Sequence, residues 1–400
     1  MESAKRWPLE GVKVLDLGQI YNGPYAGFLL AHAGADVVKV EPVDGEALRA
    51  RTGRLPPLAF SMLNTNKRGL ALDLKSEHGK DLLRRLVREA DVLLENFAPG
   101  VLERLGVGVD TLQAENPRLI YATSSGYGIS GPAKDNLAMD LTVQAVGGVM
   151  SVNGPEDGPP LKTGLAVCDF FGGVHLYAGI MTALYERSVT GRGRLVEVAM
   201  QEAVYPVLAT NLSALQRNDW KQPERRGNHH PTGTSAPYNV YPCQDGYLAI
   251  ICVREHHWTN LLRAIGREDA LDDERFSTAI LRAEHEAEVD AIVTNWTKRT
   301  RKHDAAKLLK ENHVPGAPVR DLVEVTADPH MHQRGMLHDY EHPVLGSIVL
   351  PTSPLRFGES PPPAVREEPG IGEHTDEVLR QWLRCPVEEI ENLRAQRIVA

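Results

Sequence analysis

The stretch GLAVCDFFGGVHLYAGIMTALYERSVTGRG, residues 164–193, carries the strongest signal in this chain. It predicts a long apolar helix over residues 170–189, with the carboxylate of Asp169 at its start. The helix dipole and the free backbone N–H groups stabilise an ionised carboxylate there, which serves either as a helix cap or as a nucleophile. Gly172 and Gly173 favour the nucleophile, because glycine in a helix is costly unless another group must approach closely.

Apolar runs alternate with helical patterns on both sides of this stretch. Strands are predicted at residues 12–17, 35–41, 69–74, 91–97, 118–128 and 194–200, and helices at residues 24–33, 77–90 and 100–114. Strands that alternate with helices are typical of an α/β protein with a parallel sheet.

The pattern changes after the last of these strands. A polar stretch at residues 218–239 is either a linker or a surface loop. A small α+β unit follows, with a strand at 247–253 and helices at 255–266 and 284–311. From residue 318 the chain carries a strand at 347–351, a proline-rich turn at 361–363 and a closing helix at 374–383. We therefore predict a large domain in residues 1–217, a linker and small domain in 218–317, and a return segment of the large domain in 318–400.

Composition narrows the class of protein. The 400 residues carry a net charge of −9, which argues against a surface that coats nucleic acid. We expect no membrane-spanning helix, because no uncharged apolar run approaches about 20 residues, and no secretory signal, because the N-terminus lacks an apolar region. The four cysteines form no C-x-x-C pair, so we expect reduced thiols and a cytoplasmic protein.

The first strand–turn–helix unit imitates a dinucleotide-binding fold and ends in the acidic Glu41. Its turn reads GQIYNGPYAG, which is not G-x-G-x-x-G, so the sequence argues against NAD. The turn can still present backbone N–H groups to a phosphate-bearing ligand. A nearby group of basic, amide and aromatic residues either grips a phosphorylated, adenine-bearing ligand or consists of solvated strand ends. Its members are Lys67, Arg68, Lys75, Asn96, Phe97 and Arg104.

Other reactive side chains point to less specific chemistry. The histidine pairs at 229–230 and 256–257 lack the spacing of a zinc site, so no metal is predicted. Cys168 reads as a small core residue rather than a catalytic thiol. Asp140, in LAMDLTVQAVGG, is a second acid that could lie in the same pocket as Asp169.

Several motifs in order along the chain resemble the class III CoA-transferases, the formyl-CoA:oxalate and carnitine CoA-transferase group. They are LEGVKVLDL and GPYAG, GADVVKVEP, NTNKRGLALDLK, ADVLLENFAPG, NPRLIYATSSGYG, the Asp169 stretch with TGRGRLVEVAMQEA, RRGN, ENHVPGAPV and GEHTDEVL. The motifs run almost from end to end, so the resemblance covers the whole chain.

The resemblance implies a Rossmann-like large domain built from both chain ends, a small domain, and a homodimer whose subunits interlock like chain links. It implies that Asp169 is the catalytic aspartate and that residues 19–21, with Gln19 and Tyr21, lie beside the thioester. It places the CoA nucleotide against Leu72, Lys75, Asn96, Phe97 and Arg104. No tightly bound cofactor is implied, because the coenzyme A thioester is itself a substrate.

Two departures from the family limit what the resemblance implies about the substrate. The oxalate enzymes carry a run of glycines where this chain reads GNHHPTG, and basic residues where it has Pro42 and Val43. Related α-methylacyl-CoA racemases pair their aspartate with a histidine, but this chain has Met139 there, before Asp140. We therefore expect an enzyme that moves CoA from an acyl-CoA to a free carboxylic acid. The alternatives are a racemase-like isomerase and a non-catalytic acyl-CoA-binding protein. Arg49, Arg51 and Lys162 could select a dicarboxylate.

Overall fold

The structure is a computed structural model that describes residues 6–50, 58–358, 360–361 and 364–400. Arg51 and part of the proline-rich turn at 361–363 therefore lie outside the described residues. Contacts divide the chain into two compact units. Unit 1 combines the chain up to Gly147 with Gly164–Tyr205 and Asp328–Ala400, and unit 2 combines Gly148–Thr163 with Pro206–Ala327. Both chain ends thus contribute to unit 1.

Unit 1 is built on a six-stranded sheet in the order β3-β2-β1-β4-β5-β6, and every neighbouring pair is parallel. The strands are β1 (Lys13–Asp16), β2 (Asp36–Glu41), β3 (Arg68–Ala71), β4 (Val92–Glu95), β5 (Ile120–Ser125) and β6 (Leu195–Ala199). The six predicted strands and the parallel α/β class are confirmed. This order is that of nucleotide-binding doubly wound sheets, in which the connection reverses direction between β1 and β4.

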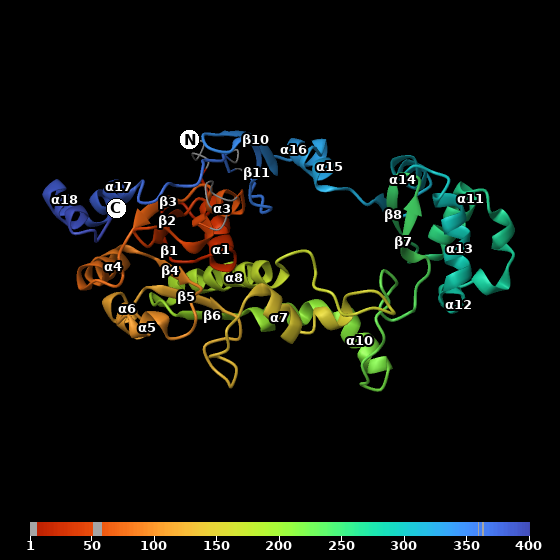
Figure 1. The fold of residues 1–400 in the computed structure, drawn as a ribbon, viewed down its shortest axis with the longest axis horizontal. Coiled ribbons are helices and arrows are strands. Elements are labelled where there is room, and N and C mark those ends of the chain that lie inside the picture. The colour runs from red at the N-terminus through yellow and green to blue at the C-terminus, as the bar shows by residue number, and fades with distance from the viewer. Residues whose placement is uncertain (1–5, 51–57, 359, 362–363) are drawn as a thin grey trace. The chain divides into compact units, whose positions relative to one another are not determined.

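Alternating strand residues supply two apolar cores, one on each face of the sheet. Figure 1 shows, as a ribbon, the strands of this sheet and the helices around it. Val14 and Val92 belong to the core under α1 (Asn22–His32) and α8 (Val167–Thr190). Their neighbours Leu15 and Leu93 belong to the opposite core. That core also takes side chains from α4 (Glu77–Glu89), α6 (Val109–Glu115), α17 (Thr375–Leu383) and α18 (Val387–Ala395). Burial on both faces explains why β1 and β4 read as continuous apolar runs, whereas β6, at the edge of the sheet, is partly exposed.

The predicted helix over residues 100–114 is wrong as a single element. The chain forms α5 (Val101–Arg104) and α6, separated by a turn in which Gly106 has φ 76°. The remaining short helices of unit 1 are α2 (Ala47–Ala50), α3 (Leu58–Asn64), α7 (Asp140–Val146), α9 (Met200–Val204) and α16 (Pro329–Gln333). A hairpin of β10 (Leu337–His342) and β11 (Gly346–Pro351) completes the unit.

Unit 2 contains an antiparallel sheet of β7 (Tyr238–Cys243), β8 (Gly246–Ile251) and β9 (Gly316–Pro318). Its helices are α10 (Ala209–Arg217), α11 (Glu255–Ala264), α12 (Ala279–Glu284), α13 (Glu286–Thr297), α14 (Lys302–Glu311) and α15 (Leu322–Thr326). The predicted helix at 284–311 is divided, because Arg301 adopts an extended conformation at the N-cap position that precedes α14. Trp258 and Phe276 lie in the core of this unit.

The unit boundaries differ from the predicted domain limits. Residues 148–163, 206–217 and 318–327 belong to unit 2, although the sequence pattern assigns them to the large domain. Side-chain to backbone contacts account for the first of these segments. Arg225 donates hydrogen bonds to the carbonyl oxygens of Pro155 and Gly158, which ties this segment to the linker. The periodicity of apolar residues cannot predict such contacts.

Among the described residues, one helix is long and apolar enough to cross a membrane, namely α8 with 24 residues. Asp169 and Glu186 bound the uncharged part of this helix, so α8 meets the criterion on length and mean composition without an uncharged apolar run of about 20 residues. In this structure α8 packs against α1, β5 and β6, and a third of its most apolar window is buried. Core helices of globular proteins meet the same criterion, so the helix alone does not indicate a membrane.

Candidate active site

A cavity of about 380 Å³ lies at the carboxyl ends of the sheet strands in unit 1. Leu17 and Gln19 follow β1, Glu41 ends β2, Leu72 follows β3 and Phe97 follows β4, so the cavity includes the point where the connection reverses. Open α/β sheets bind their ligands at this position. The structure thus brings together five of the predicted residues, which are Gln19, Leu72, Lys75, Phe97 and Arg104.

The cavity combines an apolar wall with cations at its edge. Leu72 is buried, Phe97 is partly exposed, and the side chains of Lys75 and Arg104 are exposed to solvent. Arg104 ends α5 beside Gly100, where a Cβ atom would lie 2.9 Å from the guanidinium. An aromatic ring in a cavity that two exposed cations also line suits a flat heterocycle that carries phosphate groups.

Lys67 and Arg68 do not contribute to this cavity, contrary to the interpretation that they could grip a phosphorylated ligand. The Lys67 ammonium is fully buried, 2.7 Å from the carboxylate of Asp16. Arg68 forms two hydrogen bonds with Asp36, at 2.9 and 2.5 Å. Buried charges require such partners, so both side chains are committed to ion pairs inside unit 1 rather than to a ligand. Arg49 likewise binds Glu41 through two hydrogen bonds, which commits it to an internal ion pair.

Asn96 lies beside the cavity and holds the loop that follows β1. Its Oδ1 accepts a hydrogen bond from the Gln19 N–H at 2.7 Å, and its Nδ2 donates to the Gln19 carbonyl at 2.9 Å. This predicted residue therefore fixes the backbone of Gln19, which contributes to the cavity wall.

Asp169 lies in the first turn of α8, as predicted, and is partly exposed. The residue that caps this helix is Asp140, at the start of α7. Asp140 Oδ1 accepts hydrogen bonds from the N–H groups of Cys168, at 2.8 Å, and of Asp169, at 3.4 Å. Asp140 Oδ2 accepts a hydrogen bond from Gln144 at 2.6 Å. Of the two roles open to Asp169, the capping role thus belongs to Asp140, which favours the nucleophile.

Gly172 and Gly173 allow the start of α1 to approach the first turn of α8. A Cβ atom on Gly172 would lie 2.5 Å from the Asn22 side-chain nitrogen, and one on Gly173 would lie 2.6 Å from the Asn22 carbonyl oxygen. The ring of Tyr21 stacks on Phe170 with the centroids 6.2 Å apart. Tyr21, which precedes α1, and Asp169, in the first turn of α8, therefore lie where the starts of these two helices meet. Asn22 and Phe170 were not among the predicted site residues. Only the Gly172–Gly173 pair indicated that another group approaches the helix here.

Burial keeps the Cys168 side chain from acting as a nucleophile. Cys168 is fully buried, and desolvation raises the pKa of its thiol to about 12, with smaller contributions from Asp140 and Asp169. The prediction that Cys168 is a core residue is confirmed.

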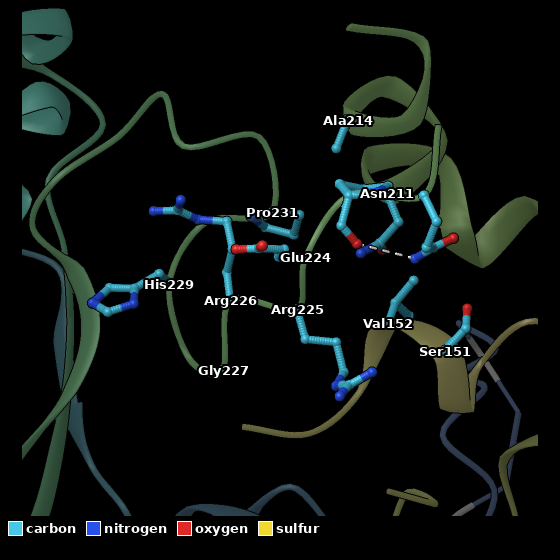
Figure 2. Close-up of a pocket in the computed structure, with 12 residues that line it drawn as sticks. Ser151, Val152, Asn211, Ala214, Glu224, Arg225, Arg226, Gly227, His229 and Pro231 are labelled. Atoms are coloured by element: carbon cyan, nitrogen blue, oxygen red, sulfur yellow. Dashed lines mark hydrogen bonds between the residues drawn. The ribbon is translucent and has the colours of Figure 1, made fainter. Parts of the chain in front are cut away.

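The arginine- and histidine-rich stretch of unit 2 surrounds a separate small pocket (Figure 2). His229 Nε2 lies 2.8 Å from Asp290 Oδ2, and the Tyr241 hydroxyl donates to Asp290 Oδ1 at 2.5 Å. Arg226 pairs with Glu286 at 2.6 Å. These groups are engaged within unit 2, and the part of the chain that the structure describes contains no group of three or more metal-ligating side chains arranged for an ion.

Glu95, at the end of β4, is a buried acid that the sequence analysis missed. Desolvation raises its pKa to about 7, although hydrogen bonds from Thr123 and from the Phe97 N–H oppose the rise. The folded protein then holds a proton that the unfolded chain loses near pH 4.5. The free energy of unfolding should therefore fall as the pH rises between these two values.

Glu95→Gln is expected to remove this pH-dependent part of the free energy of unfolding, because glutamine stays neutral. Its oxygen can still accept a hydrogen bond from the Phe97 N–H. Above pH 7 the variant should be more stable than the unmodified protein by up to about 3 kcal/mol. Urea unfolding at pH 5 and pH 8 measures the difference, with Glu10→Gln as the control because Glu10 is exposed and is not among the charges that shift the Glu95 pKa. Equal pH dependence in the Glu95→Gln and unmodified proteins would contradict the assignment.

Known proteins match this chain along nearly its whole length. The profile of CoA-transferase family III matches residues 9–375. A formyl-CoA:oxalate CoA-transferase of Streptomyces avermitilis is 36% identical over 98% of this chain and 99% of its own. One from Escherichia coli O157:H7 is 34% identical over 94% and 95%.

Solved structures agree with the sequence comparison. A CaiB/BaiF family protein of Brucella suis superposes with a TM-score of 0.83 at 32% identity, covering 94% of this chain and 99% of its own. The protein Rv3272 of Mycobacterium tuberculosis superposes with a TM-score of 0.80 at 31% identity, over 93% and 99%. The chain belongs to CoA-transferase family III, and the family resemblance inferred from its motifs is confirmed. It is an acyl-CoA:carboxylate CoA-transferase.

Proposed function

We propose that the protein transfers CoA between carboxylic acids through covalent intermediates on Asp169. The observation that carries this proposal is the carboxylate in the first turn of α8, whose backbone amides are bound by Asp140. The helix dipole keeps such a carboxylate ionised and hence nucleophilic. The cavity with Phe97, Lys75 and Arg104, in the same unit, suits the adenine and phosphates of CoA.

The proposed reaction begins when an Asp169 oxygen attacks the thioester carbonyl and expels CoA thiolate, which leaves a mixed anhydride. The thiolate then attacks the aspartyl carbonyl, releases the donor acid and forms an aspartyl-CoA thioester. The acceptor carboxylate repeats both steps in reverse order, so that Asp169 is regenerated. Thioester and anhydride are close in energy, so the protein mainly orients the reactants and excludes water. No tightly bound cofactor or metal takes part in these steps.

The residues of this chain do not by themselves identify the carboxylic acid that accepts CoA. Formyl-CoA with oxalate is the first pair to test, because the curated relatives carry that name. The segment GNHHPTG departs from the glycine run of the oxalate enzymes, so other acceptors belong in the same panel. Of the three basic residues suggested for a dicarboxylate, Arg49 is bound to Glu41, and Lys162 lies exposed in unit 2.

Mass spectrometry of acyl-CoA products from a donor–acceptor panel in D2O tests this function. Transfer of CoA without deuterium at the α-carbon supports it. Rapid α-deuteration of a 2-methylacyl-CoA without transfer would establish the racemase, although Met139 cannot act as its base. CoA binding without turnover would establish the non-catalytic alternative.

Phe97→Ala and Arg104→Ala are each expected to raise the KM for the acyl-CoA about tenfold, with a smaller change in kcat. Loss of stacking accounts for the first effect and loss of a charge-assisted phosphate contact for the second. Only the Arg104 variant should weaken the salt dependence of KM. Steady-state kinetics at two salt concentrations measure both effects, and Arg88→Ala, whose guanidinium binds Glu115 on α6, is the control. Unchanged KM values in both variants would contradict the assignment of this cavity as the CoA-binding site.

We further propose a cytoplasmic homodimer with interlocked subunits. Exposed apolar side chains along and beside α8 support it, since a free surface rarely presents so many together. They include Met139, Leu165, Val174, Tyr185, Val189 and Tyr205. A second copy of the chain, rather than lipid or nucleic acid, is the proposed cover for this surface. Four unpaired cysteines accord with the reducing cytoplasm.

Interlocked subunits cannot separate without partial unfolding, so two differently tagged dimers should exchange subunits no faster than that unfolding occurs. Native mass spectrometry of mixed tagged proteins measures the exchange. Mixed dimers within minutes under native conditions would contradict interlocking, and a monomer at micromolar concentration would contradict the dimer itself.

A further inference from the structure

Buried charged side chains hold the loop at residues 18–21, between β1 and α1, by its backbone. The Gly18 N–H donates to Asp16 Oδ1 at 2.8 Å, and the Gly18 carbonyl accepts from Lys39 Nζ at 2.8 Å. Asp16 and Lys39 are both fully buried. Neither charge contacts solvent, so both act entirely inside the fold.

The next residue that is held in this way is Ile20. Its N–H donates to Glu46 Oε2 at 3.1 Å, and Glu46 Oε1 lies 3.4 Å from Lys39 Nζ. The side chains of Lys39 and Glu46 are at most 1% exposed. Glu46 therefore joins the loop backbone to the same buried lysine that binds Gly18.

The conformation of Ile20 requires such support. Its φ is 64°, in the left-handed region, which a β-branched residue rarely adopts. Residues held in this region persist only where their surroundings determine the conformation, and they cluster at functional sites. Glu46 accepts the amide of this strained residue.

The loop connects the two parts of the proposed active site. Gln19 contributes to the cavity wall, and Tyr21 stacks on Phe170, which follows Asp169 on α8. A change at Ile20 would therefore displace groups on both sides. An error of about 1 Å in such a placement costs roughly 100-fold in rate.

We propose that Glu46 is a positioning residue for the transfer reaction. Together with Lys39 it holds the strained backbone of Ile20, and so it fixes Gln19 and Tyr21 relative to Asp169. This inference rests on the proposed function. Glu46 does not line the cavity, and of the residues whose placement it fixes only Gln19 does, so we expect a larger effect on the rate of transfer than on CoA affinity.

The test compares Glu46→Leu with Glu46→Gln in the full-length protein. Leucine cannot accept from the Ile20 N–H, and kcat should fall on the order of 100-fold while the Kd for CoA changes less than about threefold. The Gln oxygen can still accept, so Glu46→Gln should keep kcat within about tenfold of the unmodified protein. Hydrogen–deuterium exchange of a peptide that spans residues 17–24 should be faster in Glu46→Leu than in Glu46→Gln.

Two further variants separate positioning from general loss of stability. Glu368→Leu removes another buried carboxylate of unit 1, which binds Ser61 and His342, and it should leave kcat unchanged. Ile20→Gly in the Glu46→Leu background should recover at least about tenfold in kcat, because glycine adopts a positive φ without strain. The double variant also provides the measurement if Glu46→Leu alone does not fold.

The outcomes distinguish this inference from the function beneath it. An unmodified protein that transfers no CoA overturns the proposed function and this assignment with it. An active protein whose Glu46→Leu variant keeps kcat, or loses as much as Glu46→Gln, overturns the assignment alone. The assignment of Glu46 is also overturned if the double variant folds and Ile20→Gly does not recover kcat in it.

Discussion

Asp169→Ala is expected to lower the rate of CoA transfer at least about 1,000-fold while the affinity for CoA is unchanged. The methyl group cannot form the anhydride or the aspartyl thioester, and removal of a nucleophile leaves only the contribution of binding and orientation. CoA affinity should persist because the cavity residues Lys75, Phe97 and Arg104 are untouched. Acyl-CoA products measured by mass spectrometry, with CoA binding measured by calorimetry, separate the two effects.

Chemical trapping tests the same assignment in the unmodified protein. Hydroxylamine or borohydride added during turnover should label the peptide that contains Asp169 and no other. Asp140→Asn is the matched comparison, because the Asn oxygen can still accept from the Cys168 N–H and maintain the start of α8. That variant should retain transfer within about tenfold. Substantial transfer by Asp169→Ala, or a label elsewhere in the chain, would contradict the nucleophile.

Gly173→Ala should produce the second large loss, about 100-fold in transfer rate. The added Cβ would lie 2.6 Å from the Asn22 carbonyl oxygen, a backbone atom that cannot rotate away. The start of α1 must then move from α8, and Tyr21 moves with it relative to Asp169. Such overpacking also costs about 1–3 kcal/mol of stability. Kinetics together with urea unfolding measure both losses.

Gly179→Ala is a closely matched control on the same helix. Its Cβ would also lie 2.6 Å from a neighbouring atom, but that atom is the Val196 Cγ1 methyl, which can shift. We expect a comparable loss of stability and little change in transfer. If both variants lose transfer equally, general destabilisation rather than the position of α1 accounts for the effect.

Local patterns predicted the class of fold and several of the site residues. The six parallel strands follow from apolar runs alternating with helical periodicity, and α8 with its terminal Asp169 follows from a single stretch. The cavity residues Leu72, Lys75 and Phe97 were reached through the family motifs, and their proximity follows from the common edge at which parallel strands end. Each of these inferences depends on residues close together in sequence or on a repeated topology.

The breaks in two predicted helices could not be predicted from the local sequence pattern. Residues 100–114 contain Gly106 and Gly108, and residues 284–311 contain Arg301, yet apolar periodicity continues across both places. Boundaries between elements depend on which backbone groups find partners in the folded chain. The same holds for residues 148–163, which join unit 2 through Arg225.

By itself, the sequence determined the sheet, the long helix and the acid at its start, because those features arise from short-range periodicity and end effects. Only the tertiary structure decided the roles within the site. Asp140 caps α8 from 28 residues away, Lys67 turns inward to Asp16 across 51 residues, and the glycine pair receives Asn22. Capping, charge pairing and close approach are contacts between distant segments. Their partners are chosen by the packing of the whole unit, which no local pattern records.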